Sequence, residues 1–345
     1  MIRFECDYAE GAHPKILSRL TETNMEQTAG YGLDPHCDRG RELLKELCHK
    51  PDADVHFLVG GTQTNTTVIA SILRPHQGVI AADTGHINVH ETGAIEATGH
   101  KVLTLPHQDG KITAQQIQTL YEMHWSDGNH EHMVQPGMVY LSFPTENGTI
   151  YSKVELEAIH HVCQNCNLPL FLDGARLGYG LQAATNDLTL PDIARLCDVF
   201  YLGGTKIGAL FGEALMITNP KLKEDFRYGI KQHGGMLAKG RLLGIQFETL
   251  LEDGLYFEIS QHAVDMAMKI KEAFAKKGYQ FLYDSYTNQQ FPIIPNEVLK
   301  KLSETYAYGF WETVGDTHTA VRFCTSWATK EEQVATLLKD IEEVS

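Results

Sequence analysis

The sequence predicts an α/β protein in which a mostly parallel central sheet is followed by a smaller C-terminal α+β domain. Three observations predict this fold. Short β-branched or apolar runs alternate with segments whose apolar residues recur at helical spacing. Glycine or polar turns separate the two kinds of segment. Beyond about residue 234, two long helical patterns replace the alternation. Strands that alternate with helices are typical of βαβ units, whose parallel sheets carry helices on both faces.

The first forty residues are expected to be an irregular N-terminal arm (residues 1–40) with one short helix at Pro14–Thr23. A larger domain is expected over residues 41–235. Its strands are short apolar runs, namely Val55–Val59, Val79–Ala82, Lys101–Leu105, Met138–Ser142, Leu168–Leu172, Asp198–Leu202 and Ala214–Thr218. Its clearest helical patterns are Thr62–Leu73, Thr113–Met123 and Lys153–Cys166.

The smaller domain is expected over residues 236–345. Two long helices open it, at Met236–Leu251 and Phe257–Lys277. Short strands and a last helix then follow, at Tyr279–Tyr283, Gln290–Ile294, Val321–Thr325 and Lys330–Val344. This part of the chain therefore has the order of helices and strands that is typical of an α+β domain.

The balance of charged residues excludes some classes of binding partner. The 345 residues include 29 Lys and Arg against 44 Asp and Glu, a net charge of −15 at pH 7. A nucleic-acid partner is not expected, because such binding depends on cations that neutralise phosphates. The sequence shows no signal-peptide core and no run of eighteen apolar residues, so no membrane partner is expected. Seven scattered cysteines indicate reduced thiols in a cytoplasmic protein that binds a small molecule.

Three expected strands end in residues that carry chemistry. In α/β sheets, ligands bind at the carboxyl ends of the strands. The first strand runs into Gly60-Gly61-Thr62, with Asn65 close behind, and then into a helix. Glycines let the backbone approach an anion, and the first helical turn supplies free N–H groups. A plain strand-to-helix turn capped by Thr62 would have the same sequence, so this motif alone leaves both interpretations open.

The other two strand ends carry opposite charges. Asp173 directly follows a buried strand, where an unpaired carboxylate would be costly. It could face a ligand cation, or form an internal ion pair with Arg176, or cap a helix. Lys206 follows another buried strand and lies among glycines. A lysine in such surroundings can attack an aldehyde to form a Schiff base, but a rim lysine paired with an acid is equally compatible.

Taken together, the three strand ends favour pyridoxal 5'-phosphate (PLP) as cofactor. The helix start would hold the phosphate, Asp173 would keep the pyridine nitrogen protonated, and Lys206 would hold the aldehyde carbon. Asp173 and Lys206 are 33 positions apart, which leaves room for one crossover and one strand. The two side chains can therefore converge on one ring.

On these residues the sequence resembles the threonine aldolase / β-eliminating lyase family of fold-type-I PLP enzymes along essentially the whole chain. The resemblance rests on several motifs, namely Gly61-Thr62 with Asn65, Gly85-His86 with Glu91, Leu172-Asp173-Gly174-Ala175-Arg176-Leu177, Thr205-Lys206 and Val321-Arg322-Phe323. It departs from the family at the N-terminus, where Cys6-Asp7-Tyr8 replaces Ser-Asp-Thr, and in the loop 143–148, which lacks a histidine. Leu237 stands where an arginine is common.

The resemblance implies a role for each matched residue. Lys206, His86 and Asp173 would be catalytic, with His86 stacked on the cofactor ring and acting as base or water-positioning group. The cofactor would be held by Gly61, Thr62, Asn65, His86, Asp173, Arg176, Thr205 and Lys206. The substrate would be held by Arg176, Arg322, Asp7 and Tyr31. Arginine suits a carboxylate because its planar guanidinium binds both oxygens at once.

The implied reaction is the cleavage of L-threonine or L-allo-threonine to glycine and an aldehyde. Another PLP activity on amino acids, such as β-elimination or transamination, and a catalytically silent member of the fold stay open. The arm segment Gly30-Tyr31-Gly32 resembles one that reaches a neighbouring subunit's site, which implies a homodimer or homotetramer with active sites near the interface.

Two further patterns resemble metal ligands. Cys163 and Cys166 form a C-x-x-C after His160 and His161, and a polar loop contains His130-Glu131-His132. Neither has a second ligand pair nearby in the sequence, so no metal site is expected. Helical periodicity instead predicts that the two cysteines pack against the sheet.

Overall fold

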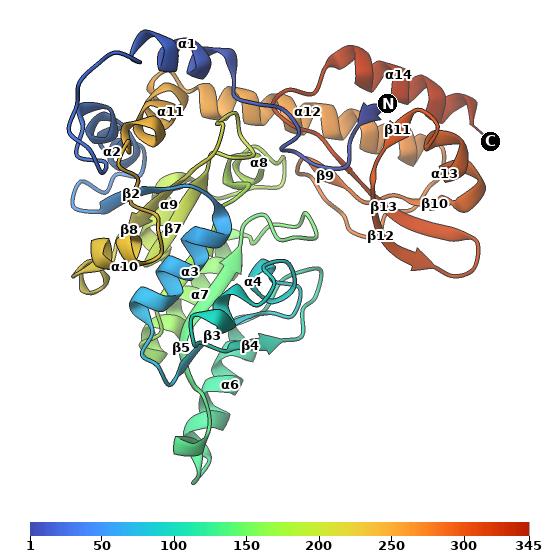
Figure 1. Ribbon diagram of the computed structural model, residues 1–345. Helices are drawn as coiled ribbons and strands as arrows, with labels where there is room; N and C mark the ends of the chain where they lie inside the picture. The colour runs from blue at the N-terminus through green and yellow to red at the C-terminus, as the bar shows by residue number, and fades with distance from the viewer. Residues whose placement is uncertain (345) are drawn as a thin grey trace.

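The computed structural model describes residues 1–344 and shows a large sheet and a small sheet connected by one long helix (Figure 1). The large sheet has seven strands in the order β2-β8-β7-β6-β5-β3-β4. Their bounds are β2 Asp54–Leu58, β3 Gln77–Ala82, β4 Val102–Leu105, β5 Gln135–Ser142, β6 Leu170–Asp173, β7 Val199–Gly203 and β8 Glu213–Ile217. The strands from β4 to β7 pair in parallel, whereas β8 runs antiparallel to β2 and β7. The predicted mostly parallel sheet is therefore confirmed.

Side chains of successive residues point to opposite faces of this sheet. In β5, Met138 and Tyr140 enter one apolar core, whereas Val139 and Leu141 enter the other. Helices cover both faces (Figure 1). They are α3 Gly61–Ile72, α4 His86–Val89, α5 Ala94–Ala97, α6 Ala114–Ser126, α7 Lys153–Cys166, α8 Leu177–Leu181, α9 Leu190–Leu196 and α10 Phe226–Gln232, with 3₁₀ turns at His130–His132 and Pro220–Leu222. Because both faces are buried, the strands are continuous apolar runs, as parallel sheets require.

The N-terminal segment contains more regular structure than the sequence indicated. Beside the expected helix, α1 Pro14–Glu22, it contains α2 Pro35–Leu47. The carboxylate of Asp34 accepts a hydrogen bond from the backbone N–H of Cys37, and Pro35 occupies the first helical position. Both features are typical of helix starts, so this helix could have been recognised from the sequence. Residues 4–13 and 24–34 contain no helix or strand, so the irregular arm is confirmed there, but its expected end at residue 40 falls inside α2.

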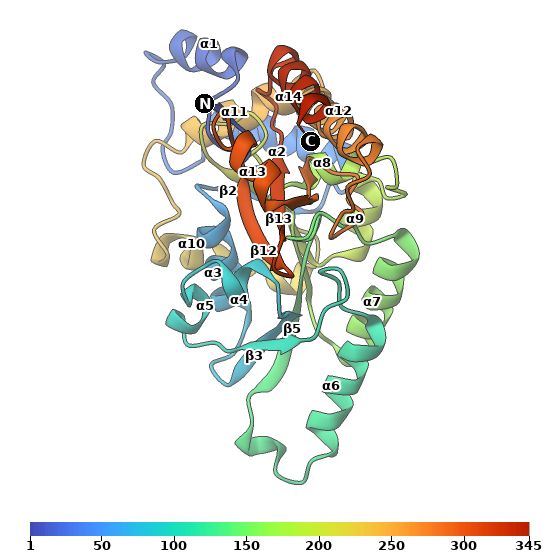
Figure 2. The same ribbon diagram turned by 90° about the vertical axis from the view of Figure 1, so that its right-hand side faces the viewer.

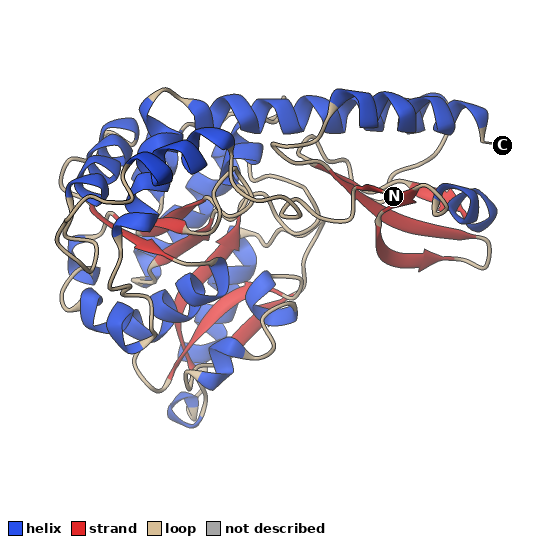
Figure 3. Ribbon diagram, turned by 45° about the horizontal axis from the view of Figure 1, so that its top comes forward, coloured by secondary structure: helices blue, strands red, loops and turns tan. Residues whose placement is uncertain are grey.

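Two consecutive helices lead to the small sheet. They are α11 Arg241–Glu252 and α12 Leu255–Lys276, and α12 extends from the large sheet to the small one (Figures 1 and 3). The predicted helix start at Met236 is wrong, because Met236 and Leu237 have no regular structure and residues 238–240 form a turn, in which the Ala238 carbonyl accepts a hydrogen bond from Tyr31 N–H. The helix begins only after Gly240.

The small sheet faces the viewer in Figure 2, with β12 and β13 in front of the large sheet. The remaining elements are β1 Ile2–Arg3, β9 Gln289–Gln290, β10 Ile293–Pro295, α13 Asn296–Leu302, β11 Tyr306–Ala307, β12 Gly309–Val314, β13 His318–Cys324 and α14 Glu331–Glu343. The sequence missed β12, which pairs antiparallel with β13. The strand expected at Tyr279–Tyr283 is wrong, because this segment makes only a single bridge, between Phe281 and Pro292.

Between residues 1 and 344, no helix combines the length and the hydropathy needed to cross a bilayer. Loops gather between the large sheet and the small one (Figure 3). Several of these loops follow the carboxyl ends of the large sheet's strands, where the chemistry-bearing residues lie.

Candidate active site

One cavity brings together most of the residues that the sequence singled out. It has a volume of about 700 Å³ and opens to solvent. The residues that line it are Val59, Gly60, Gly61, Thr62, Asn65, His86, Ser142, Pro144, Glu146, Asp173, Ala175, Arg176, Tyr201, Thr205, Lys206 and Glu213. The expected convergence of the three strand ends is therefore confirmed in space. Arg322, Asp7 and Tyr31 are not among the lining residues.

Asp173 is the last residue of β6 and is almost fully buried. Its Oδ2 accepts hydrogen bonds from the Tyr140 hydroxyl at 2.6 Å and from the Asn65 amide at 3.1 Å, and its Oδ1 accepts one from Ala175 N–H at 3.0 Å. Burial by itself would raise the pKa of Asp173, but the charge of His86 and these donors outweigh it and lower the pKa. The carboxylate is therefore ionised at the floor of the cavity.

Asn65 and Glu91 hold His86 in place beside this carboxylate. The Asn65 amide donates to Glu91 Oε1 at 2.7 Å as well as to Asp173, and His86 Nδ1 lies 2.8 Å from the same Glu91 oxygen. Burial works to lower the pKa of His86, but Glu91 and the nearby Asp173 raise it above its ordinary value. Glu91 thus fixes the orientation of the ring and leaves Nε2 available to a ligand.

Lys206 follows β7 and reaches the same cavity. No carboxylate of residues 1–344 lies within 4.0 Å of its amine, so the alternative of a rim lysine paired with an acid is wrong. Burial and the positive charge of Arg176 lower the pKa of Lys206. A lowered pKa makes more of the amine neutral and therefore nucleophilic.

The helix α3 begins at the cavity wall. Its N-cap, Gly60, contributes no side-chain cap, so the alternative of a turn capped by Thr62 is wrong. The N–H groups of the first helical turn have no carbonyl partner within the helix and carry the positive end of its dipole. The hydroxyl of the fully buried Tyr201 faces Asp173 and lies 3.3 Å from the position that a Cβ on Gly61 would occupy. This end of the cavity offers donors suited to an anion.

Arg176 does not pair with Asp173. Its Nε and Nη2 donate to the carboxylate of Asp7 at 2.6 and 3.0 Å, so the alternative of an internal Asp173–Arg176 ion pair is wrong. Burial opposes ionisation of Asp7, but Arg176 and Lys206 lower its pKa to about 2. Nη1 of Arg176 has no partner in residues 1–344 and is left for a ligand.

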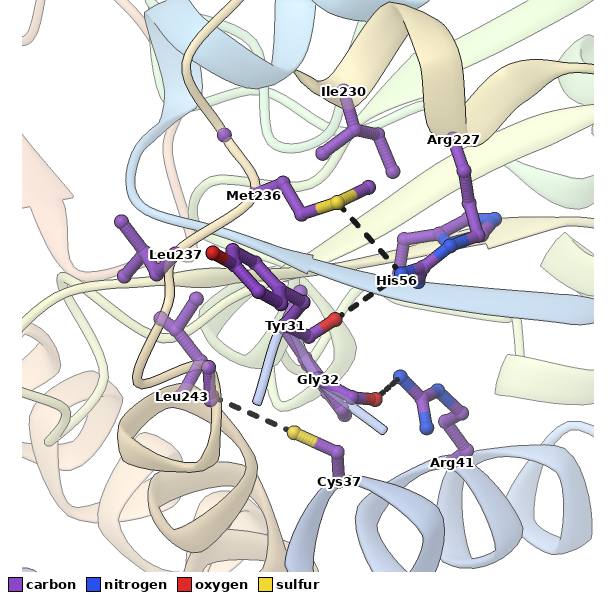
Figure 4. Close-up of a pocket in the computed structure, with 13 residues that line it drawn as sticks. Tyr31, Gly32, Cys37, Arg41, His56, Arg227, Ile230, Met236, Leu237 and Leu243 are labelled. Carbon is purple, nitrogen blue, oxygen red and sulfur yellow. Dashed lines mark hydrogen bonds between the residues drawn. The ribbon is translucent and has the colours of Figure 1, made fainter. Parts of the chain in front are cut away.

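Two of the predicted substrate residues lie away from the cavity in this chain. Arg322 donates to the Glu5 carbonyl at 2.9 Å and to the Gln289 side chain at 3.2 Å, and its guanidinium lies 5.9 Å from the Trp311 ring. Tyr31 lines a different pocket, of about 350 Å³, in which the side chain of Arg227 reaches its carbonyl (Figure 4). The roles of both residues stay predictions.

The sequence reasoning missed two acids that line the cavity, Glu146 and Glu213. Glu146 lies in the loop after β5, and its Oε1 accepts from the backbone N–H of His86 at 2.9 Å and from the Ser142 hydroxyl at 2.7 Å. Burial raises its pKa. Glu213 is the first residue of β8, and only the antiparallel direction of that strand places it here.

The patterns that resemble metal ligands lie elsewhere. Cys163 and Cys166 are buried on α7, as predicted from helical periodicity. His130 packs against the rings of His124 and Trp125 at the end of α6. Across residues 1–344, no three His, Cys, Asp or Glu side chains are grouped so as to hold a metal ion.

The chain is similar in sequence or in structure to several known proteins. The family model described as beta-eliminating lyase matches residues 7–296. The low specificity L-threonine aldolase of a Pseudomonas species (strain NCIMB 10558) is 30% identical over 99% of this chain and 97% of its own. The structure of Leishmania major threonine aldolase is 47% identical, covers 99% of both chains and has a TM-score of 0.96. Aspartate aminotransferase from Thermus thermophilus, 15% identical over 100% of this chain and 96% of its own, has a TM-score of 0.71 and shows the fold alone. These similarities confirm the predicted fold class.

Proposed function

The chain belongs to the beta-eliminating lyase family, and on that premise we propose that it is a PLP-dependent carbon–carbon lyase. Its substrates would be L-threonine, L-allo-threonine and related β-hydroxy-α-amino acids. The products would be glycine and an aldehyde. The observation that carries this proposal is the pair formed by an ionised Asp173 and an amine with a lowered pKa, Lys206, in one cavity.

The residues present fit PLP as the cofactor. The N–H groups at the start of α3 and the hydroxyl groups of Thr62 and Thr205 would hold the phosphate. Asp173 would keep the pyridine nitrogen protonated, and Lys206 would bind the aldehyde carbon. When bound, PLP supplies the electron sink that accepts the electron pair of the broken Cα–Cβ bond.

The protein's own residues would orient the substrate. Nη1 of Arg176 is available to one carboxylate oxygen, because the other edge of the guanidinium is held by Asp7. Arg322 would supply the second contact after a change of its present partners, the Glu5 carbonyl and Gln289. A carboxylate fixed in this way can set the Cα–Cβ bond perpendicular to the cofactor plane, where its cleavage is favoured.

Cleavage also requires that the β-hydroxyl lose its proton while Cα gains one. His86 Nε2 and the second carboxylate oxygen of Glu146 are the two candidate acceptors in the cavity. The raised pKa of His86 limits its neutral form near pH 7. The raised pKa of Glu146 makes that carboxylate a stronger base than an exposed glutamate.

We also propose that the protein is a homodimer or homotetramer located in the cytoplasm. Tyr31, Leu33 and Tyr228 are exposed and lie on the arm and on α10, which contact each other where Lys231 lies 5.0 Å from the Tyr31 ring. An apolar surface of this kind supports a subunit contact. All seven cysteines are free, which supports a reducing compartment.

A product assay tests the proposed reaction. Purified protein supplied with PLP is incubated with L-threonine and, separately, with L-allo-threonine. Glycine and acetaldehyde are then measured, and the proposal expects equal amounts of the two products. Formation of a keto acid with ammonia would indicate β-elimination instead, and an amino-group acceptor requirement would indicate transamination. Protein that acquires no visible absorption on addition of PLP would overturn the cofactor assignment and favour a silent member of the fold.

A further inference from the structure

Glu213 is a buried acid in the middle of a site that is expected to receive an anion. It is 3% exposed and pairs with Leu58 of β2 and Gly203 of β7, at the carboxyl ends of both strands. Its Oε1 accepts from the Thr205 hydroxyl at 2.9 Å, and its Oε2 lies 3.2 Å from Gly204 N–H. Thr205 is one of the residues that would hold the phosphate, so Glu213 lies directly behind the proposed anion position.

The surroundings of Glu213 supply little positive charge. No Lys, Arg or His of residues 1–344 comes within 4.0 Å of its carboxylate. The titratable groups that face it are Lys206, Asp173, Tyr201 of β7 and Tyr256 of α12.

The other elements packed nearby add no close charge. The helix α3 has no titratable residue, and α11 presents Leu243 and Phe247 to the turn before β8. Asp54 and His56 of β2 pair with residues farther along β8.

A buried carboxylate with two hydrogen-bond donors and no ion pair resists ionisation. Burial outweighs the hydrogen bond from Thr205 and the charge of Lys206, and raises the pKa of Glu213 to about 8. At pH 7 the group is therefore mainly a carboxylic acid. In that form it can donate to Thr205 Oγ1, 2.9 Å away, which leaves the Thr205 hydroxyl proton for the phosphate, whereas the ionised form can only accept.

We propose that Glu213 takes part in cofactor binding as a neutral acid that must hold its proton while the phosphate is bound. The inference rests on the proposed function, because it requires an anionic group at the start of α3. An ionised Glu213 would place a second negative charge beside the phosphate in a buried site, which opposes binding. Bound phosphate in turn raises the pKa of Glu213 further, so binding above pH 8 takes up one proton from solvent.

The sign of the pH dependence follows directly. Only the protonated form of Glu213 binds the phosphate well, so affinity falls as the pH rises through the pKa of the free protein. The expected loss approaches tenfold for each pH unit above about 8.

The test compares the wild type with Glu213→Gln. Glutamine keeps the shape of the side chain and can donate to Thr205 Oγ1 as the neutral acid does, but it cannot ionise. The probe is 4'-deoxypyridoxine 5'-phosphate, which lacks the aldehyde and therefore cannot react with Lys206.

The dissociation constant of this probe is measured by equilibrium dialysis between pH 6.5 and 9.5. The ratio of wild-type to variant values is expected to be constant below pH 7.5 and to rise about tenfold between pH 8 and 9.5. Because the phosphate titrates in both proteins, its effect cancels. Lys206 faces Glu213, so its titration differs between the two proteins, and the comparison is repeated with Lys206→Met in both to remove this amine.

The exposed surface residue Glu42 gives a matched control, since Glu42→Gln removes one charge far from the cavity and is expected to keep the wild-type profile. A ratio that stays flat across the whole range would overturn the proposal. Wild-type protein that binds neither this probe nor PLP would instead overturn the proposed function itself.

A second measurement needs no variant. Infrared difference spectra of the wild type, recorded at pH 9 with and without the probe, are expected to show a protonated carboxylic acid band that appears on binding. Absence of this band contradicts the proposal even if Glu213→Gln fails to fold.

Discussion

Asp173 and Glu213 are two buried carboxylates at the same edge of one sheet, and their pKa values are shifted in opposite directions. Burial works to raise the pKa of Asp173, but the nearby imidazole of His86 and three accepted hydrogen bonds outweigh it and lower the pKa. Burial raises the pKa of Glu213 to about 8, because one hydroxyl, one backbone N–H and the charge of Lys206 do not outweigh it. Burial is similar in both cases. The comparison shows that the supply of donors and cations, rather than burial, decides which acid is ionised.

The largest expected effect comes from removing the ionised member of this pair. Asp173→Asn keeps the size of the side chain but cannot hold a proton on the pyridine nitrogen, so kcat for threonine cleavage is expected to fall about 10³-fold. Steady-state kinetics at saturating PLP measure this, with circular dichroism as the check on folding. A variant within tenfold of the wild type would show that the charge of Asp173 is not needed.

The second largest effect concerns Glu146, a third buried acid of the cavity. Glu146→Gln is expected to lower kcat about 10²-fold, because the side chain keeps its hydrogen-bonding shape but no longer accepts the hydroxyl proton. Exchange of the glycine α-proton with D₂O, which does not involve a β-hydroxyl, serves as the internal control and is expected to change little. Equal losses in both reactions would indicate a structural role instead.

A smaller change would weaken the contrast between the two acids. Tyr140→Phe removes the donor that lies 2.6 Å from Asp173 Oδ2. Since a hydrogen bond to a charged group contributes about 1.5 kcal/mol, the pKa of Asp173 is expected to rise by about one unit. The acidic limb of the kcat/KM profile then shifts to higher pH by the same amount. An unmoved limb would mean that Asp173 does not control it.

The smallest expected effect lies in the arm, where a cation is shared between two acids. His36 lies 2.6 Å from Glu248 and 2.9 Å from Glu26, and although burial works against the charged form, these carboxylates raise its pKa. A raised pKa in the folded state stabilises the protein below the unfolded pKa of about 6.5, and this contribution is lost as the pH rises through the folded pKa.

His36→Gln is therefore expected to cost about 1 kcal/mol in urea unfolding at pH 6 and less at pH 9. A loss that is the same at both pH values would show that packing, rather than charge, is what His36 contributes.

The local sequence was sufficient for the large sheet and for the positions of its ligand-binding turns. Asp173, Lys206 and the glycines before α3 each follow a continuous apolar run, and parallel strands bring such ends to one edge. The Asp34-Pro35 pair is also a local signal for the start of α2. The Tyr279–Tyr283 strand was wrong because a short apolar run does not show whether a partner strand is available.

The sequence by itself determined which strand ends carry an acid, an amine and an anion-binding turn, because those features depend on neighbours in the chain. Only the tertiary structure decided which charges meet. Arg176 binds Asp7, 169 positions away, rather than Asp173 nearby, and Glu213 enters the cavity because β8 runs antiparallel to its neighbours. Ionisation of a buried group depends on every charge and donor within a few ångströms, and those neighbours come from strands and loops that are distant in the sequence.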